Sequence, residues 1–593
     1  MTTTSTPPVL HGGSWLTGAA DPASVLTPER LSAEHRLIGQ TAEEFVDNEV
    51  LPVLDRLEAK DWALARALVK RCGDLGLLGT DVPEEFGGVA LDKASSLLVG
   101  EAAGRCASFA TTFGAQTGLA ITPILCFGSD EQKQKYLPGL VSGEIVGAYA
   151  LSESGSGSDA LSAKARAVRQ ADGSFVLNGE KMWISNGGFA DLFVVFAKVV
   201  DGADSAAGQF TAFLVERSFS GVSSGKEEHK MGLHGSSTTP LVLQDARVPA
   251  GNVLGEVGKG HKVAFNVLNY GRFKLGAMCS GGARRVIGQA AAYAAQRKQF
   301  GQPIASFGAV KHKLAEMVIR EYAVEAMLYR TAGLIDAAIN GSHESHAVLA
   351  ALEEFAIEAS ILKVASSEMI DFVVDQNVQI HGGNGYVHDY PAETQYRDAR
   401  VNRIFEGTNE INRLLIPGML VRRAVNGELA LIAAAKRLQD EILTPSMPAA
   451  GLTDAGPLDA EFKTVAACKK VALMVLGTAM QTYGEKLADQ QEVLSYTADI
   501  MCETYASESA VLRAAASAKD RDLHETAARV FVNDSAQRLE AAARSALAGM
   551  SEGDTLRTLL AALRRVLKVT PVNTVALRRH LADAAIQKGG YIL

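Results

Sequence analysis

The sequence predicts a multidomain α+β protein in which helical regions lie on both sides of a β-rich region. Its 593 residues exceed what one hydrophobic core usually serves. Apolar residues recur at helical spacing in the early and late parts of the chain, and short β-rich runs lie between them. The predicted regions are a disordered arm (1–30), an N-terminal helical domain (31–145), a middle β-domain (146–256), a C-terminal helical domain (257–430), a linker (431–457) and an extra helical domain (458–593).

The N-terminal residues carry no targeting pattern. The segment Met1 to Pro8 has neither the basic start nor the apolar stretch of a secretory signal, and it lacks the arginines of a transit peptide. We therefore expect a short disordered arm and a cytoplasmic protein. Helical spacing begins near Leu31, with a break expected at Pro52 because proline removes a helix hydrogen bond. No apolar run reaches the roughly 18 residues that a membrane-spanning helix needs.

The middle region alternates β-rich runs with turns. Leu192 to Ala197 and Phe210 to Val215 are two such runs, and Gly, Asp, Asn and Ser residues separate them from their neighbours. This spacing predicts an antiparallel, barrel-like domain or a sandwich. Farther along, the segment from Thr444 to Pro457 is rich in Pro, Gly and Ala, which is typical of a linker.

Composition and charge exclude several classes of protein. The net charge is −9, whereas nucleic-acid binding needs a basic face, so no nucleic-acid partner is expected. The six cysteines form no Cys-x-x-Cys pair, which argues against a disulfide framework or a zinc ribbon. His381 has no second ligand candidate at metal spacing, so we expect no metal site.

The segment from Arg397 to Glu410 carries the strongest chemical signal. It places Glu406 between the apolar pair Ile404-Phe405 and the turn Gly407-Thr408. Apolar neighbours raise a carboxyl pKa, and a glycine lets a substrate approach the backbone closely. A general base for a weakly acidic proton would be built in this way. The alternative is a plain helix start with Thr408 as its N-cap, and both interpretations can hold together.

A Ser/Gly-rich loop follows the first predicted strand. The run Ser152-Glu-Ser-Gly-Ser-Gly-Ser158-Asp-Ala has the glycine string of a dinucleotide fingerprint, but a hairpin follows it instead of the required helix. The Rossmann interpretation therefore fails. Backbone N–H groups and serine hydroxyls could still bind a heterocycle and a phosphate, or the loop could be a simple turn. Trp183, on a later strand, could cover a flavin ring or pack in the core.

Two further segments end long helices. Arg297 precedes Lys-Gln-Phe300-Gly and could pair with a pyrophosphate, or it could complement the helix dipole from solvent. Gln379-Ile-His-Gly-Gly383-Asn-Gly-Tyr has three glycines within four residues, which indicates close approach of the backbone to another element or to a ligand.

Together these motifs resemble the acyl-CoA dehydrogenases. Five motifs occur in the family's order between about residues 35 and 420, beginning with the Tyr149-Ala-Leu-Ser loop and ending with Arg403-Ile-Phe-Glu-Gly-Thr-Asn-Glu-Ile. The extra helical region and the Asn269-Tyr-Gly-Arg-Phe variant look most like the very-long-chain subgroup. The resemblance implies an N-terminal helical domain, a β-domain, a four-helix-bundle domain and an additional C-terminal helical domain, with FAD held between domains and across a subunit interface.

The resemblance also implies roles for individual residues. Glu406 matches the base that removes the α-proton of the acyl thioester, and its backbone N–H, together with a flavin ribityl hydroxyl, would hold the thioester carbonyl. Some relatives carry the base at the position of Gly271, where glycine cannot serve. Matches to FAD contacts are Tyr149, Leu151, Ser152, Ser158, Trp183, Ile184, Ser185, Thr408 and Glu410 from one subunit, with Arg297, Phe300, Gln379 and Gly383 from its neighbour. Matches near the substrate are Ser158, Asn269, Arg272, Phe405 and Gly407. Ser154 departs from the usual proline, and Ser152 from a frequent threonine.

The function implied is FAD-dependent dehydrogenation of long-chain acyl-CoA in β-oxidation, with an electron-transferring flavoprotein as acceptor. An acyl-CoA oxidase and a non-catalytic assembly protein on the same fold are the alternatives. The helix around Gly114, Ala115, Gly118 and Ala120 should line the acyl pocket, and small residues there leave room for a long chain. The same small residues could instead allow two helices to pack closely.

The extra helical region implies a homodimer, because relatives that carry it usually use it to cover the face on which tetramers pair. Leu556, Leu559, Leu560, Leu563 and Leu567 keep helical spacing, so we expect this segment to dock on the protein's own core. Basic residues among these leucines (Arg557, Arg564, Arg565 and Lys568) make peripheral membrane binding the less favoured alternative.

Overall fold

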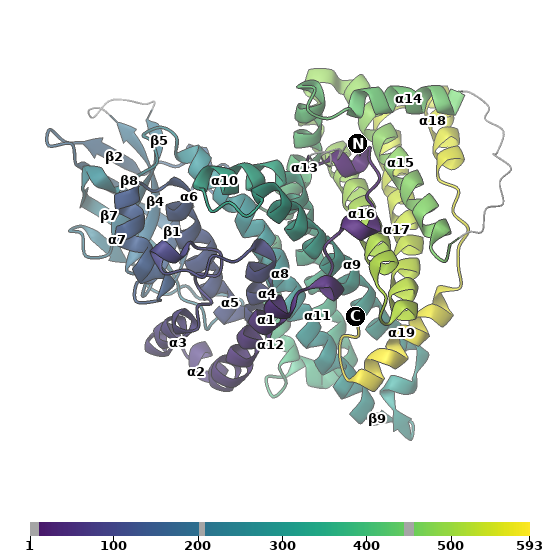
Figure 1. Cartoon of the computed structure of the whole chain (residues 1–593), viewed down its shortest axis with the longest axis horizontal. Coiled ribbons are helices and arrows are strands. Elements are labelled where there is room, and N and C mark those ends of the chain that lie inside the picture. The colour runs from purple at the N-terminus through teal and green to yellow at the C-terminus, as the bar shows by residue number, and fades with distance from the viewer. Residues whose placement is uncertain (1–10, 201–207, 444–455) are drawn as a thin grey trace, which may run out of the picture.

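The computed structural model describes residues 11–200, 208–443 and 456–593. Figure 1 shows the β-domain at one end, the long helices α8 (Gly260–Gln296), α9 (Gly308–Ile339) and α11 (Ala356–His381) in the centre, and the C-terminal extension at the other end. The predicted order of helical, β and helical regions is confirmed.

The N-terminal helices are short, and polar side chains cap several of them. Asp61, Asp92 and Ser129 each accept a hydrogen bond from a first-turn N–H, which satisfies a donor that the helix itself leaves free. A π-helical segment, η7 (Ala115–Ile121), interrupts the helical run between α5 and α6. The helices are α1 (Ala33–Phe45), α2 (Leu54–Glu58), α3 (Trp62–Asp74), α4 (Lys93–Gly104), α5 (Ala107–Gly114), α6 (Thr122–Phe127) and α7 (Asp130–Val141).

The β-domain is largely antiparallel, as predicted, but it also contains parallel pairings that the sequence did not predict. Strand β4 pairs in parallel with β1 along one half of its length and with β2 along the other, and it pairs antiparallel with β5. The sequence pattern missed this because alternation reports which face is buried and carries no strand direction. The strands are β1 (Gly147–Ala150), β2 (Arg166–Arg169), β3 (Phe175–Ser185), β4 (Leu192–Val200), β5 (Gln209–Glu216), β6 (Val222–Ser224), β7 (Thr238–Val248) and β8 (Val253–Leu254).

The central bundle is built on α8, α9, α11 and α13 (Asn409–Val425), with the shorter α10 (Ser345–Glu354) and α12 (Ala392–Ala399) beside them. A small hairpin of β9 (Lys298–Gln299) and β10 (Gln302–Pro303) follows α8. The extension adds α15 (Asp459–Tyr483), α16 (Gln491–Ala516), α17 (Arg521–Met550), α18 (Gly553–Val566) and α19 (Thr574–Lys588). The described helices include no segment with the length and hydrophobicity that crossing a bilayer requires.

The predicted linker is partly helical. Its first half forms α14 (Leu431–Leu443), an amphipathic helix that buries Leu431, Ala434 and Leu438 against α15. This spacing is helical, but the mixed charges of the segment masked it. Residues 444–455 of the predicted linker lie outside the described residues. The leucines of α18 pack against the same core, with Leu563 fully buried.

The predicted disordered arm is ordered from residue 11. Trp15 and Leu16 are buried between the bundle and the extension, and the Trp15 Nε1–H donates to Glu358 Oε1 at 3.1 Å. The Gly13 N–H donates to the same oxygen at 2.7 Å. Two apolar residues carry no periodicity, so the sequence could not show this tertiary contact. Residues 1–10 of the arm lie outside the described part of the chain.

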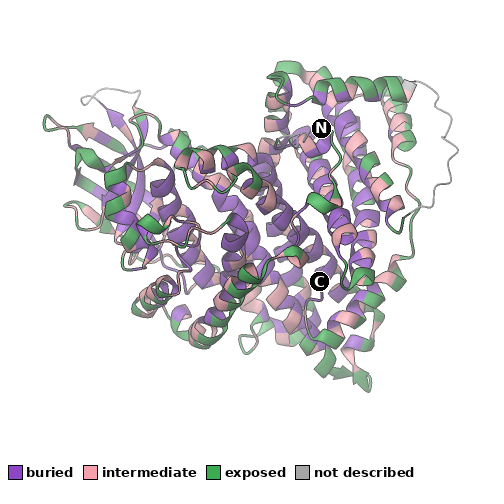
Figure 2. Cartoon of the chain, viewed as in Figure 1, coloured by how far each residue is buried: buried purple, intermediate pink, exposed green. Residues whose placement is uncertain are grey.

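The buried residues form two cores rather than four. One core joins the N-terminal helices to the β-domain, and the other joins the bundle, the extension and the Trp15 segment. Figure 2 shows buried residues running without a break from the bundle into the extension. The extension therefore shares its hydrophobic core with the bundle and does not have a core of its own.

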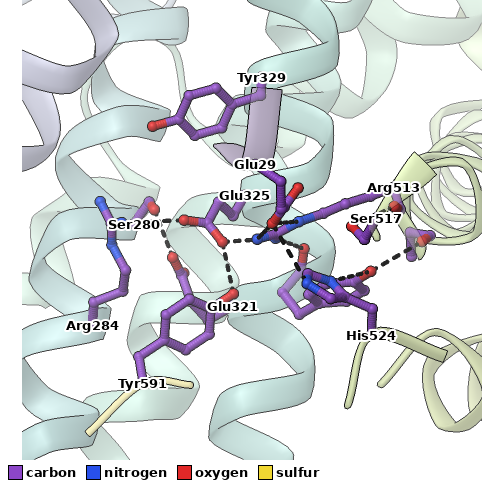
Figure 3. A network of polar contacts seen from close by, with 12 residues as sticks. Glu29, Ser280, Arg284, Glu321, Glu325, Tyr329, Arg513, Ser517, His524 and Tyr591 are labelled. Carbon is purple, nitrogen blue, oxygen red and sulfur yellow. Dashed lines mark hydrogen bonds and ion pairs between the residues drawn. The ribbon is translucent and has the colours of Figure 1, made fainter. Parts of the chain in front are cut away.

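A buried chain of alternating charges crosses this second core (Figure 3). Glu101 on α4 pairs with Arg284 on α8 at 2.7 Å, and Arg284 pairs with Glu325 on α9 at 3.1 Å. Arg513 on α16 then bridges Glu325 and Glu29 of the N-terminal arm, at 2.7 Å each. Five segments from distant parts of the sequence thus share one charge network.

One glutamate of this network holds a proton. The Ser280 hydroxyl lies 2.8 Å from Glu101 Oε1 and 2.6 Å from Glu321 Oε1, but a serine has one hydrogen to donate. One of the two carboxyls must therefore supply the other hydrogen. Glu101 also has Arg284 and Tyr329 as partners, whereas Glu321 Oε2 has none among the described residues. Burial raises the pKa of both Glu101 and Glu321, but only Glu101 has an arginine partner, so these contacts assign the proton to Glu321.

Replacing Glu325 with Gln should strongly destabilise the protein, because it removes the carboxylate that Arg284 and Arg513 share. Breaking a buried pair costs about 3–5 kcal/mol. Glu321→Gln is the matched control and should be near neutral, because glutamine keeps the shape of the uncharged acid. Because the pKa of Glu321 is raised in the folded protein, the wild type loses stability through this group as the pH rises above 4.5. Glutamine does not titrate, so Glu321→Gln should become more stable relative to the wild type toward alkaline pH. Thermal unfolding at several pH values checks this, and equal losses in both variants would contradict it.

Candidate active site

A cavity of about 360 Å³ runs along one face of α8. Gly271, Leu275, Met278, Gly282 and Arg285 line it at a spacing of three or four residues, which places them on a single helical stripe. At 1.5 Å per residue, the stripe extends for about 21 Å. The opposite walls come from α5 and η7, from α12 and from the segment that ends at Glu406.

Glu406 lies at one end of this cavity in a left-handed backbone conformation. Its φ is 57° and that of Gly407 is 79°, and Thr408 then starts α13 by accepting a hydrogen bond from the Ile411 N–H. A positive φ is uncommon for a non-glycine residue and often marks a functional site. The helix start that the sequence offered is therefore present, and the Glu406 carboxylate lies just before it in the cavity wall.

Two side chains hold the Glu406 backbone in place. The Asn412 amide donates to the carbonyl oxygens of Glu406, Gly407 and Thr408 at 3.4, 2.9 and 3.1 Å. The Arg272 Nε–H donates to the Glu406 carbonyl at 3.1 Å, and its Nη1 donates to Asn269 Oδ1 at 2.9 Å. These bonds offset the strain of the left-handed turn and fix the direction of the carboxylate.

The electrostatics of the site leave Glu406 poised near neutral pH. Its Oε2 is enclosed and has no hydrogen-bond partner among the described residues. Burial raises the pKa of Glu406 to about 7, while the charges of Arg272 and Lys363 act in the opposite direction. Burial in turn lowers the pKa of Arg272 to about 10 and that of Lys363 to about 8. A carboxylate with such a pKa can accept a proton that an ordinary glutamate would leave in place.

Gly271 provides the space that the carboxylate occupies. A methyl group at position 271 would lie 2.6 Å from Glu406 Oε2 and 2.9 Å from its Cδ. Any side chain on α8 at this point would displace the carboxylate. Gly271 cannot supply a base, but its lack of a side chain leaves the space that the Glu406 carboxylate occupies.

The Ser/Gly-rich loop is held by a buried ion pair. Lys181 Nζ donates to Glu153 Oε1 at 2.7 Å and to the Leu151 carbonyl at 3.2 Å. Glu153 also accepts from the N–H groups of Lys164 and Ala165 at 2.6 and 3.0 Å. Ser158 lies exposed in this loop. The loop is thus a fixed structure that presents hydroxyl and N–H groups beside β3.

The predicted flavin-facing residues of β1 and β3 lie near the Glu406 end. Trp183 is 56% exposed and has a φ of 59°, which excludes the core-packing alternative. The Tyr149 hydroxyl is enclosed and unpartnered among the described residues, and burial and then the charge of Glu406 raise the pKa of Tyr149. Ser185 lines the cavity. Leu151 and Ile184 are buried, so only their backbone groups can face a ligand.

The other predicted cofactor residues form a separate cluster at the far end of α8. The Tyr293 ring stacks on His381 at 4.0 Å, which brings the β9–β10 hairpin and the glycine turn after α11 together. Phe300 is 93% exposed there. Gly271 and the end of α8 are separated by about 37 Å of helix. One chain therefore does not bring Arg297, Phe300, Gln379 and Gly383 to its own Glu406.

Sequence reasoning assigned no role to several residues that shape the site. Lys363 is fully buried on α11 and donates to Asn409 Oδ1 at 2.6 Å, directly behind the Glu406 turn. Its signal was a lone lysine within an apolar helical run. Asn412 and the Lys181–Glu153 pair gave no comparable signal, because their partners are backbone groups or lie far away in the sequence.

Models of four acyl-CoA dehydrogenase domains match the chain. The N-terminal domain matches residues 32–144, the middle domain 148–246, one C-terminal domain 258–419 and a second C-terminal domain 467–565. A probable acyl-CoA dehydrogenase of Bacillus subtilis is 45% identical over 98% of both chains. The chain belongs to the acyl-CoA dehydrogenase family.

Two further relatives extend this result. The crystal structure of an acyl-CoA dehydrogenase complexed with FAD from Bacillus anthracis has a TM-score of 0.94 and 45% identity, and the match covers 98% of this chain and all of that one. A mitochondrial very long-chain specific acyl-CoA dehydrogenase of Macaca fascicularis is 41% identical over 66% of this chain and 60% of that protein. The predicted resemblance to the family, including its extra C-terminal domain, is confirmed.

The residues of this acyl-CoA dehydrogenase fit FAD, its cofactor. An enclosed tyrosine hydroxyl without a partner, an exposed tryptophan held in a strained conformation and a rigid loop of hydroxyl and N–H donors lie on neighbouring strands. Such a set supplies an aromatic face and polar groups for a ring with hydrogen-bonding edges.

Proposed function

We propose that Glu406 is the general base of this acyl-CoA dehydrogenase and that the enzyme acts on long-chain acyl-CoA in β-oxidation. The observation that carries the first part is the enclosed, unpartnered Glu406 Oε2 at the end of an extended cavity. Burying a carboxylate without hydrogen bonds is costly, and carboxyl groups perturbed in this way are concentrated at functional sites.

The chain's own residues account for proton removal. Glu406 takes the proton from the α-carbon of the thioester, so that an O–H bond forms as the C–H bond breaks. The Glu406 N–H donates to no acceptor among the described residues and is free to bind the thioester carbonyl, which makes the α-proton more acidic. Arg272 and Lys363 keep part of the Glu406 population ionised. FAD, when bound, accepts the hydride from the β-carbon.

The binding roles follow the geometry of the two residue clusters. Near Glu406, we assign FAD contacts to Tyr149, Ser152, Ser158, Trp183, Ser185, Thr408 and Glu410, with Leu151 and Ile184 acting through their backbone. Asn269, Arg272, Phe405, Gly407 and Ser158 would border the thioester and the adjoining part of CoA. In the family an electron-transferring flavoprotein accepts the electrons, and we propose the same acceptor here. The bacterial source of the full-length relative supports a cytoplasmic location.

The length of the cavity supports a long acyl chain. An extended alkyl chain advances by about 1.3 Å per carbon, because its bonds are about 1.5 Å long. The roughly 21 Å stripe on α8 therefore accommodates about 16 carbons. Gly114, Ala115 and Gly118 line the cavity as the sequence predicted. Ala120 is not among the residues that line it and instead packs against Gly147 of strand β1.

We also propose a homodimer. Arg297, Phe300, Gln379 and Gly383 form an exposed cluster that cannot reach the Glu406 site of their own chain. A second copy that presents this cluster to the first would complete both cofactor sites. The extension occupies one side of the bundle and leaves this cluster exposed.

Glu406→Gln should keep FAD and acyl-CoA binding but slow flavin reduction by at least ~10³, which lies in the upper range for loss of a general base. Since only the ionised carboxylate accepts the proton, kcat/KM of the wild type should rise with pH up to about 7 and then level off. Anaerobic mixing with substrate measures the reduction through flavin bleaching. Bleaching of the variant at near wild-type rate would place the base elsewhere, and peroxide release under air would favour the oxidase alternative.

Ala115→Glu should shift the preferred acyl chain from long to medium length. Its neighbours Gly114 and Gly118 lie beside Met278 and Lys274, which are three to seven residues beyond Gly271 on α8. A glutamate there would close the cavity about 5–10 Å from the base, leaving room for about eight carbons or fewer. A chain-length series with an artificial electron acceptor checks this, with Ala120→Ser as a control outside the cavity. A short-chain optimum in the wild type would contradict the long-chain assignment.

Arg297→Ala should weaken FAD binding although the residue lies about 37 Å along α8 from its own Glu406 region. In the proposed dimer the guanidinium serves the neighbouring site. Light scattering should give the mass of two chains, and FAD titration of the apoprotein should show the loss of affinity. A tetramer mass, or an unchanged affinity for FAD, would count against the proposal.

A further inference from the structure

The end of the cavity away from Glu406 is polar. Its middle is lined by Leu275, Met278 and Cys279, whereas Arg285 lies about 21 Å along α8 from Gly271. Asp55, Glu58, Asp389 and Asp398 also line the cavity. Of these, Glu58 and Asp398 lie close to Cys106, as Arg285 does. An acyl chain that ends in a methyl group offers these half-buried polar groups no hydrogen bond, and a buried polar group without a partner is unfavourable.

Arg285 has hydrogen-bond donors to spare at this end. Its Nη1 donates to the Arg105 carbonyl at 2.7 Å, and within the described ranges no carboxylate lies within ion-pair distance of it. Arg105, by contrast, is paired with Asp47 at 2.7 Å. A guanidinium has five N–H donors, so Arg285 can bind a further oxygen. It is half-buried, and burial lowers its pKa, so part of its guanidinium is removed from water.

The carboxylates decide which oxygen fits best. Glu58 Oε1 accepts from Ser108 and from the Gly235 N–H, and Asp398 Oδ1 accepts from the Leu233 N–H, so each has lone pairs left. Asp55 and Asp389 are exposed. A hydroxyl can accept from Arg285 and donate to a carboxylate at once. A terminal carboxylate can only accept, so it could bind Arg285 but could donate nothing to Glu58 or Asp398.

We infer that the cavity takes long acyl chains that end in a hydroxyl group, and that Arg285 donates a hydrogen bond to that hydroxyl. This rests on the proposed function, because it treats the cavity as the acyl site. It makes Arg285 a specificity-determining residue that lies far from the reacting carbons.

The test compares ω-hydroxyhexadecanoyl-CoA with hexadecanoyl-CoA on the FAD-loaded enzyme. The wild type should oxidise the hydroxylated chain with kcat/KM at least equal to that of the plain chain. Arg285→Met removes the donors and keeps an apolar stem, so it should lower this ratio by about tenfold or more, as expected for a lost hydrogen bond to a charged group. The plain chain should be little affected, which separates a loss of recognition from misfolding.

Two controls sharpen the result. Arg105→Met removes the arginine that is already paired with Asp47, and it should leave the ratio unchanged. The pair ω-hydroxyoctanoyl-CoA and octanoyl-CoA ends beside Met278, so the hydroxylated form should be the poorer substrate in the wild type and in Arg285→Met alike.

Three outcomes would overturn the inference: a hydroxylated long chain that is a tenfold poorer substrate than the plain one, a ratio that Arg285→Met leaves unchanged, or a preference for hexadecanedioyl-CoA over the hydroxylated chain. The first two would leave the long-chain proposal standing if hexadecanoyl-CoA is oxidised well. Failure to oxidise hexadecanoyl-CoA itself would overturn both.

Discussion

The alternating chain of Glu101, Arg284, Glu325, Arg513 and Glu29 sets the arrangement on which the rest of the molecule depends. Each charge comes from a different element, and each arginine satisfies two carboxylates. Taking such charges out of water is costly, so the network tolerates few alternative geometries. Hydrophobic packing alone would allow helices to slide along one another. The network instead specifies one register for α4, α8, α9, α16 and the N-terminal arm.

The network also fixes the position of α8 at the active site. Arg284 of the network and Arg285 of the cavity are adjacent, and the same helix carries Gly271 against Glu406 about 20 Å away. Since a long helix packed on all sides transmits position along its axis, fixing its middle fixes the space at both ends. The extension contributes Arg513 to this arrangement, so it supports the cavity without lining it.

The sequence predicted the order of the domains and singled out Glu406, which lies in the cavity wall, because both leave local signals. Helical and β periodicity report buried faces, and Glu406 stands beside the glycine and the N-cap that its conformation requires. The failures were tertiary. Trp15 is ordered by Glu358, which lies more than 300 positions away in the chain, and the parallel pairing of β4 with β1 depends on strand direction. Lys363 and Asn412 act through partners that only the folded chain brings near.

The turn that carries Glu406 is stabilised by hydrogen bonds to its backbone and not by bonds to the Glu406 carboxylate. A left-handed glutamate with an unpartnered oxygen is unfavourable on two grounds, strain and desolvation, each of the order of 1–3 kcal/mol. Hydrogen bonds from Asn412 and Arg272 go to the backbone of the turn and not to the carboxylate. If they bound the carboxylate, they would lower its pKa and remove its ability to take a weakly acidic proton. Holding the backbone while leaving the carboxylate without partners is the arrangement that the proposed role of Glu406 as a base requires.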